Sequence, residues 1–399
     1  MNKRFKFAPL LTFIFVIICV SCSFSPQDNV VDPQEGFRPS GEEGFDIVFW
    51  ESGRKSGKIV VPSTFDRKPV TGVVLDLEYW VLESSDNVIT LPATVKRVRI
   101  EAGYDSPSII NSINIPKALE ELTFIYSARI KSFDVESGGV FSLFGDFLMK
   151  PIEDGYELTK VQCKSQTTLS IPISVKTIGD SAFAYLTELK SITIPDSVSY
   201  IGQEAFRGCK SLTSITIPDS VTTISAAMFR GCKSLTNIVV PDSLTSIESI
   251  AFAGCESLAS FTIPDSVDSI GSRAFNSCSG LKSIIIPNSV TSIEWATFAY
   301  CTSLESVVIP NSVDRIGDGA FYDCVGLTSI TIPDSVTSIG EQAFAECTGL
   351  TDIFFSGTKE KWKTVSKWKY SDEDRYRYRN SFYNVPATVV HCSDGDVEI

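Results

Sequence analysis

The chain of 399 residues contains a single histidine, His391. Nucleophilic Ser–His or Cys–His pairs, and zinc sites built from several imidazoles, need side chains that this sequence does not supply. His391 stands beside Cys392 in a run typical of a strand, where neighbouring side chains point to opposite faces. Aspartate and glutamate are plentiful, but no spacing singles out a carboxylate pair of the kind that hydrolases use. We therefore expect no catalytic residue, no metal site and no enzyme activity.

The sequence is also short of positive charge. Lysine and arginine number 35 against 48 aspartates and glutamates, and the formal net charge is −13. A nucleic-acid partner is held by a surplus of lysine and arginine along the phosphate backbone, so this composition argues against one. Acidity here favours solubility. No cofactor is expected.

A hydrophobic run near the start is too short to cross a bilayer. Lys3, Arg4 and Lys6 precede the mostly apolar run 7–20, which falls short of the ~20 residues that a spanning helix needs. The following Val-Ser-Cys22-Ser resembles the lipobox of a bacterial lipoprotein signal. We expect a lipoprotein-type signal at 1–22, with Cys22 as the lipid-bearing N-terminus. An ordinary secretory signal cut nearby is the alternative.

The next segment has the composition of a linker. Residues 23–43 are rich in proline, glycine, serine and acidic residues, which predicts a flexible tether. Such a tether would hold an exported protein at the bacterial outer membrane or cell surface by its N-terminal lipid.

A period of 23 residues dominates the chain from 172 to 355. Proline and phenylalanine each recur at this spacing eight times, with no insertion or deletion. The prolines are Pro172, Pro195, Pro218, Pro241, Pro264, Pro287, Pro310 and Pro333. The phenylalanines are Phe183, Phe206, Phe229, Phe252, Phe275, Phe298, Phe321 and Phe344. This regularity predicts a solenoid of eight coils.

Each unit divides into a strand, a turn and an arc. Apolar and polar residues alternate at the end of the run 212–217, which predicts a strand with its isoleucines facing inward. Pro218 ends the strand because it cannot donate to a ladder. Asp219 and Ser220 are turn residues whose side chains can bond nearby backbone amides. The Ala-Phe-x-x-Cys segment suits a short helical arc. A unit this small cannot bury its own apolar face, so stability comes from stacking on its neighbours.

The repeat Ile-Pro-x-Ser-Val-x-x-Ile-Gly-x-x-Ala-Phe-x-x-Cys-x-x-Leu resembles the BspA-like leucine-rich repeats of bacterial and treponemal surface antigens. The resemblance implies a leucine-rich-repeat solenoid with one parallel strand per turn, short helical or irregular convex arcs, and a cap at each end. Weaker resemblance extends outward to an opening strand, two degenerate turns, a hairpin insert and a terminal cap, at 58–70, 89–92, 113–116, 145–148, 355–362 and 390–395.

The resemblance gives a division of the chain. An N-terminal cap with degenerate repeats and a hairpin insert is expected at 44–171, eight repeats at 172–355, and a C-terminal cap at 356–399. The spacing between 93 and 171 is irregular, so the edges of the N-terminal part stay open.

Seven cysteines follow the same period: Cys209, Cys232, Cys255, Cys278, Cys301, Cys324 and Cys347. Stacked turns would place their Cα atoms ~5 Å apart, inside the range of a disulfide. Equivalent side chains on stacked turns point the same way, however, and Leu186 fills the equivalent place in the first turn. We therefore favour buried thiols that act as small core residues over disulfides or metal ligands. Cys163 and Cys392 stay unassigned.

The outward positions of the repeat strands form two columns, which we expect to be the binding face. The first column is Ser191, Ser214, Asn237, Ser260, Ser283, Ser306, Ser329 and Asp352. The second is Thr193, Thr216, Val239, Thr262, Ile285, Val308, Thr331 and Phe354, and Lys190, Lys282 and Glu305 add charge beside them. Short side chains lose little entropy when a partner protein docks. The same small residues also suit a sheet that has no partner, and both interpretations stay open.

The segment 359–383 mixes basic and aromatic residues, a pattern that can hold a sugar or a single-stranded nucleic acid. The acidic whole argues against nucleic acid. The alternative is a cap in which Thr358 starts a short helix, and Trp362 and Val365 cover the exposed edge of the last coil.

These observations together predict a lipid-anchored bacterial surface protein that binds a protein partner. The BspA resemblance implies adhesion to host matrix or to other cells. A second hypothesis is a periplasmic or secreted scaffold that binds glycans through the aromatic C-terminal segment. A carboxylate-based hydrolase is the least supported.

Overall fold

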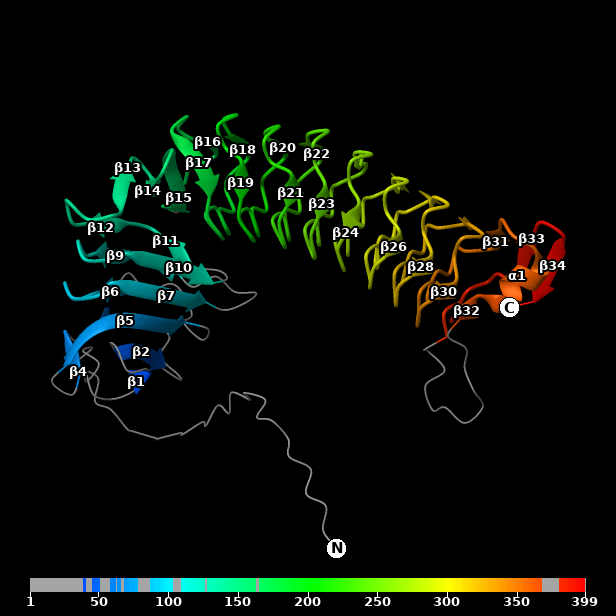
Figure 1. Ribbon diagram of the computed structural model, residues 1–399, viewed down its shortest axis with the longest axis horizontal. Coiled ribbons are helices and arrows are strands. Elements are labelled where there is room, and N and C mark those ends of the chain that lie inside the picture. The colour runs from blue at the N-terminus through cyan, green and yellow to red at the C-terminus, as the bar shows by residue number, and fades with distance from the viewer. Residues whose placement is uncertain are drawn as a thin grey trace, which may run out of the picture.

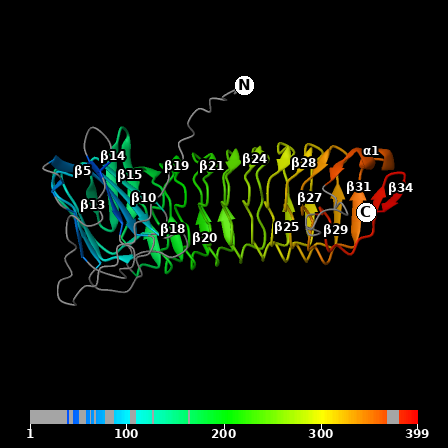
Figure 2. The same cartoon turned by 90° about the horizontal axis from the view of Figure 1, so that it is seen from below.

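The computed structural model describes residues 39–40, 45–50, 58–61, 63–65, 68–77, 87–102, 109–125, 128–162, 165–367 and 380–398. These residues form a solenoid whose coils stack into an arch (Figure 1). Seen from below, the coils lie side by side from the N-terminal strands to the C-terminal cap (Figure 2). The expected signal, Cys22, Cys163 and most of the expected tether lie outside the described residues.

A first column of strands follows the Leu-x-x-Ile-x-Ile motif. Parallel partners in it are 23 residues apart, as in the pairs Ser214–Asn237 and Ser306–Ser283. One repeat therefore makes one coil, and the predicted solenoid is confirmed. The strands are β16 (Thr168–Ser170), β18 (Ser191–Thr193), β20 (Ser214–Thr216), β22 (Asn237–Val239), β25 (Ser283–Ile285), β27 (Ser306–Val308), β29 (Ser329–Ile332) and β31 (Asp352–Phe355).

Each coil carries a second short strand, where one strand per turn was expected. These strands follow the Val-x-x-Ile motif and also pair in parallel, as Thr223 does with Ser246. They are β17 (Val175–Ile178), β19 (Tyr200–Ile201), β21 (Thr223–Ile224), β23 (Ser246–Ile247), β24 (Ser269–Ile270), β26 (Ser292–Ile293), β28 (Arg315–Ile316) and β30 (Ser338–Ile339). Most are only two residues long, too short for an alternating pattern to reveal.

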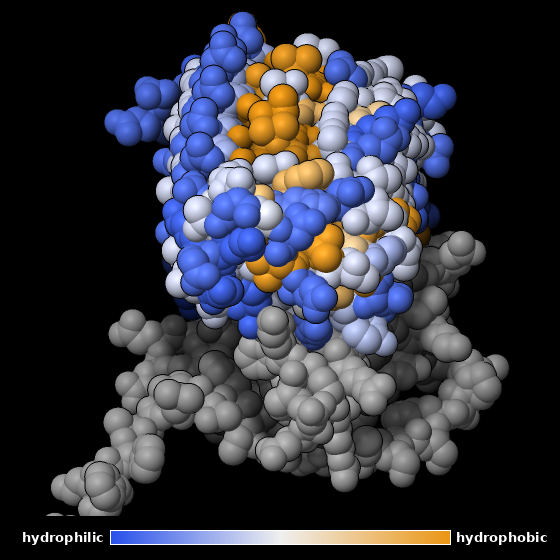
Figure 3. All heavy atoms as spheres, turned by 90° about the vertical axis from the view of Figure 1, so that its right-hand side faces the viewer, coloured by the Kyte–Doolittle hydropathy of each residue, from blue (hydrophilic) through white to orange (hydrophobic). Residues whose placement is uncertain are grey.

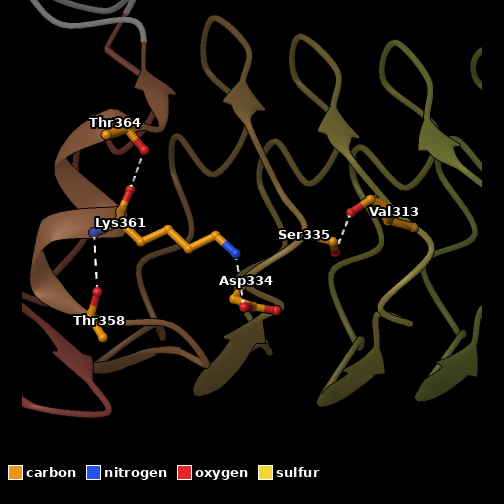
Figure 4. A network of polar contacts seen from close by, with 6 residues as sticks. All are labelled: Val313, Asp334, Ser335, Thr358, Lys361 and Thr364. Carbon is orange, nitrogen blue, oxygen red and sulfur yellow. Dashed lines mark hydrogen bonds and ion pairs between the residues drawn. The ribbon is translucent and has the colours of Figure 1, made fainter.

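The turn between the two strands is closed by proline. The backbone N–H of Val221 donates to the carbonyl of Pro218 at 3.0 Å, and the other coils repeat this bond. The serine of the turn does not bond nearby amides as predicted. Its hydroxyl instead donates to a carbonyl of the preceding coil, as Ser335 does to Val313 at 2.7 Å (Figure 4). The turn serines therefore fasten coils to each other.

The arcs are chains of turns and contain no helix. Of the two expected forms, short helical arcs and irregular arcs, the irregular form is confirmed. The reason lies in the backbone, because two residues in each arc have positive φ, such as Glu204 and Gly208 at 56° and 68°. Alternating handedness turns every second N–H group toward the next coil. Phe206 donates to Met228 at 2.9 Å and Gly208 to Arg230 at 2.7 Å. The arcs form a third row of hydrogen bonds between coils.

The same two columns continue toward the N-terminus, with longer strands in the second column. Ile59 pairs with Ile89 and Ile89 with Ile113, so the motifs expected to be degenerate turns are coils of this solenoid. The first column is β3 (Lys58–Val60), β6 (Val88–Thr90), β9 (Ser112–Ile115) and β12 (Phe133–Val135). The second is β2 (Phe45–Trp50), β5 (Lys68–Leu77), β7 (Arg97–Ala102) and β10 (Glu121–Ile125). Two-residue strands β1 (Pro39–Ser40), β4 (Thr64–Phe65), β8 (Ile109–Ile110) and β11 (Arg129–Ile130) complete this part.

An antiparallel hairpin separates these coils from the repeats. β13 (Ser142–Phe144) turns at Gly145, which has positive φ, into β14 (Phe147–Ile152). β15 (Gly155–Val161) then pairs with β17. The hairpin lies where the resemblance implied one.

The C-terminal segment adds one more coil to the stack. Helix α1 (Lys359–Thr364) begins after Thr358, whose hydroxyl accepts from the Lys361 N–H (Figure 4). β32 (Ser366–Lys367) extends the second column, and β33 (Val389–Cys392) extends the first. β34 (Gly395–Glu398) pairs antiparallel with β33.

The core of the repeats is a continuous stack of phenylalanine rings. The eight repeat phenylalanines are fully buried, and Phe382 of the C-terminal coil adds a ninth ring. Neighbouring rings lie 5.0 to 5.6 Å apart between centroids and are nearly parallel. Each buried ring contributes roughly 1.5–3 kcal/mol by leaving water.

Candidate protein-binding face

The outward side chains of the first strand column form a continuous surface, here called the strand face. It consists of the two columns of residues from Ser191 to Phe354 named above. Alternation turns the central residue of a strand inward and its neighbours outward, as in β20, where Ile215 is buried and Ser214 and Thr216 are exposed. Ser191 and Asp352 are half-buried and the other members are exposed. Lys190, Lys282 and Glu305 are exposed beside the columns.

Apolar side chains gather in the C-terminal half of the strand face. Ile285 is 67% exposed, Val308 54% and Phe354 42%. Ile285 and Val308 are direct partners in the parallel ladder, and Thr331 pairs with Phe354. The C-terminal end of the stack, which faces the viewer in Figure 3, also exposes apolar surface bordered by hydrophilic residues. Exposed apolar groups of this kind mark interaction surfaces.

The strand face is interrupted at one coil. The segment around Ser260 has no regular strand and keeps a single bridge, between Ser260 and Ser283. Phe261 replaces the usual isoleucine there, and its ring packs 5.1 Å from Phe252 and 5.5 Å from Phe275 between centroids. The coil that lacks the regular strand is thus the one in which a phenylalanine stands at the inward position. Ser260 and Thr262 are nevertheless exposed on the same side.

The C-terminal coil extends the strand face by one residue that the repeat pattern did not reveal. His391 pairs with Phe354 in the ladder, and the two rings lie 5.2 Å apart between centroids. Its Nδ1 lies 2.9 Å from an oxygen of Asp396, and its Nε2 lies 3.9 Å from one of Asp352. The alternation of the run 388–392 indicated a strand. His391 lies 37 residues after Phe354, however, and not the 23 of the repeat, so the period did not align it with the strand face.

The periodic cysteines are free and buried, as predicted. Each thiol donates to the carbonyl of the phenylalanine in the preceding coil, as Cys209 does to Phe183 at 3.1 Å and Cys278 to Phe252 at 3.2 Å. Burial raises the pKa of the Cys278 thiol to about 12. The periodic thiols therefore act both as core side chains and as hydrogen-bond donors between coils. Cys392 is half-buried and also free.

The aromatic C-terminal segment is largely a cap in the part that the structure describes. Trp362 and Val365 are buried, and the Trp362 ring packs 5.1 Å from Phe355 between centroids. Phe382 is buried as well. These rings are not available to a glycan. Residues 368–379, which include Trp368, Tyr370, Tyr376 and Tyr378, lie outside the described residues.

The described ranges contain neither a metal-binding cluster nor a membrane-spanning helix. Within them, no group of three or more histidine, cysteine or acidic side chains could hold a metal ion. No helix in that part of the chain has the length and apolar character needed to span a bilayer, and α1 has six residues.

Comparison with known proteins identifies the repeats. The family model of the BspA type leucine rich repeat region matches residues 161–282 and 268–368 in six copies. A leucine rich repeat protein of T. pallidum is 31% identical, with 47% of this chain and 90% of that chain covered and a TM-score of 0.44.

Two further solved structures are similar at lower identity. A leucine rich cell surface protein of Faecalibacterium prausnitzii is 24% identical over 83% of this chain and 95% of its own, with a TM-score of 0.30. A leucine-rich repeat protein of Bacteroides ovatus is 22% identical over 89% and 97%, with a TM-score of 0.35. No curated protein matches the chain. The family model covers more than half of the sequence, and the chain belongs to the BspA type leucine-rich-repeat family.

Proposed function

We propose that this protein is a surface scaffold that docks a protein partner on its strand face. The observation that carries the proposal is the exposed pair of ladder partners Ile285 and Val308, with exposed Phe354 beyond Thr331 in the same column, among serine and threonine side chains. Apolar area that leaves water on contact supplies binding free energy, and the short side chains around it lose little entropy. Leucine-rich-repeat solenoids are typically non-enzymatic binding scaffolds, which agrees with this role.

The partner that we infer is a protein of the host matrix or of another cell. The F. prausnitzii relative is described as a cell surface protein, and an exported chain with an N-terminal lipid at Cys22 would present its solenoid in the same way. The anchor has its own test, metabolic labelling with palmitate. Label on the wild type and none on Cys22→Ala is the expected result, and an unlabelled wild type would remove the anchor from the proposal.

Binding to a panel of immobilised extracellular-matrix proteins tests the strand face. We expect Ile285→Glu together with Val308→Glu to weaken binding at least about tenfold, because the charges must be desolvated on contact. Ser283→Glu together with Ser306→Glu should act in the same direction. Ser269→Glu, on the exposed side of β24, is the matched control and should bind as the wild type does. Undiminished binding in both double variants would place the site elsewhere.

A further inference from the structure

An open trough lies on the arc side of the repeats, outside the strand face. It encloses about 450 Å³ and spans the arcs of four successive coils. Its lining includes three small residues, Ala296, Ala299 and Gly319, among larger ones. The position of Ala299 is occupied by Asn276 one coil earlier and by Tyr322 one coil later, and both of these also line the trough. The hollow therefore arises where one coil lacks a large side chain.

Aromatic rings border this hollow and are not needed for stacking. Trp295 is 48% exposed and Tyr300 46%. The coils on either side carry Ser272 and Asp318 at the position of Trp295, so the solenoid does not require a ring there. The Trp295 indole is half exposed and lies outside the stacked core, and exposed aromatic rings of this kind are a feature of binding surfaces.

The rings are held in place by their neighbours. The Arg273 guanidinium lies 3.9 Å from the centroid of the Trp295 ring. The rings of Tyr300 and Tyr322 meet edge to face, with centroids 5.3 Å apart. Burial raises the pKa of Tyr322, with Tyr300 and Glu346 adding to the shift, so its phenol stays a neutral hydrogen-bonding group. The walls of the trough are therefore preorganised.

Polar groups of both kinds line the trough. Asn276, Gln342 and Arg273 offer donors, and Asp318 and Glu341 offer acceptors. One carboxylate oxygen of Asp318 accepts from the backbone N–H of Glu341 at 2.8 Å, which fixes that carboxylate. The carboxylates of Asp318 and Glu341 disfavour binding of an anion in the trough. The Arg273 guanidinium over the indole disfavours binding of a cation at that ring.

The geometry points to a binding site for a neutral sugar, a pyranose unit of an oligosaccharide, between Trp295 and the Tyr300–Tyr322 pair. One face of a pyranose ring is made of C–H groups and packs on an aromatic ring, while its hydroxyls both donate and accept at the rim. The trough supplies the rings, the donors and the acceptors together. It is separate from the strand face, so its test does not depend on the proposed function.

Calorimetric titration of the full-length chain tests the inference. The probes are cellotriose, maltotriose, xylotriose and tri-N-acetylchitotriose, with trilysine and trigalacturonate as charged comparators of similar size. We expect at least one neutral trisaccharide to bind at one site per chain, and the charged comparators to bind no more tightly than that trisaccharide.

Two variants locate the site and one controls for the loss of an exposed aromatic ring. Trp295→Ala removes a ring, and Ala299→Tyr fills the trough with a side chain that the next coil carries as Tyr322. Each should weaken binding at least about tenfold. Tyr200→Ala removes an exposed ring on β19 and should leave binding unchanged. Trp295 is exposed, so its removal reports on the site even if Ala299→Tyr fails to fold. Absence of binding by all four neutral probes, full binding in Trp295→Ala, or a clear preference for a charged comparator would each overturn the inference.

Discussion

At the residue scale, the arcs depend on backbone conformations that most side chains resist. Gly208, Gly231 and Gly254 hold positive φ in three coils, and Ser277 holds the equivalent conformation at 59° one coil later. A left-handed conformation costs a non-glycine residue roughly 1 kcal/mol. The stack tolerates this cost because each such arc gains hydrogen bonds to its neighbour.

Exchanges at these positions should change stability in opposite directions. We expect Ser277→Gly to raise the free energy of unfolding by about 0.5–1 kcal/mol, and Gly231→Ala to lower it by about 1 kcal/mol or more. An added Cβ at Gly231 meets nothing closer than 3.9 Å, so strain and not collision decides the result. Denaturant melts check both. Ser279→Gly, which lacks positive φ, is the control and should destabilise; a gain there would contradict the argument.

The buried thiols make the fold sensitive to alkali. The Cys278 pKa is raised from its ordinary 9.0 to about 12 by burial, so the folded thiol stays protonated where the unfolded one ionises. The stabilisation is complete below pH 9 and is lost as the pH rises toward 12. The Cys278 thiol should cost up to about 1.4 kcal/mol of stability per pH unit in that window. Cys278→Ala should flatten the fall between pH 9 and 11 in denaturant melts, and an unchanged slope would contradict this.

Most core residues were predictable from the sequence, because the 23-residue period fixes them. The phenylalanines, cysteines and inward isoleucines all lie where the period put them. The turn serines were misjudged, since a single unit does not show that Ser335 would reach the carbonyl of another coil. His391 was set apart from the strand face because the offset of the last coil departs from the period.

At the scale of elements, the cap is a short helix that closes the stack by burial. Trp362 is 3% exposed and packs against Phe355, while Lys361 forms an exposed ion pair with Asp334 at 2.8 Å (Figure 4). This helix was predicted from its capping threonine and its apolar pair. The second strands were not predicted, because they are too short to show a period. The arc geometry was not predicted either, because it depends on bonds between coils.

The two contacts of the cap should differ in energetic value. Trp362→Ala should lower the free energy of unfolding by roughly 3–5 kcal/mol, since it empties a buried site next to the last coil. Lys361→Ala should cost under about 1 kcal/mol, because the ion pair is exposed. Thermal melts of the two variants make the comparison. Equal effects would show that the helix is held by charge and not by burial.

At the scale of the whole molecule, the core divides into two clusters that meet at the hairpin. One cluster runs from Ile59 to Leu148 and the other from Met149 to Val390. Lys160 is buried near this junction, with its Nζ 2.5 Å from the carbonyl oxygen of Ser181 and 5.0 Å from the centroid of Phe124 in the first cluster. The aliphatic stem and ammonium of one side chain thus link the two parts.

The three rows of bonds between coils also decide how the protein responds to mechanical force. All three run along the stacking axis, so a pull on the two ends opens them one coil at a time instead of shearing many together. Each coil that detaches should release 23 residues, an extension of roughly 80 Å. Optical tweezers should therefore record a series of unfolding steps of equal extension through the regular repeats. A single large rupture would show that the coils yield together.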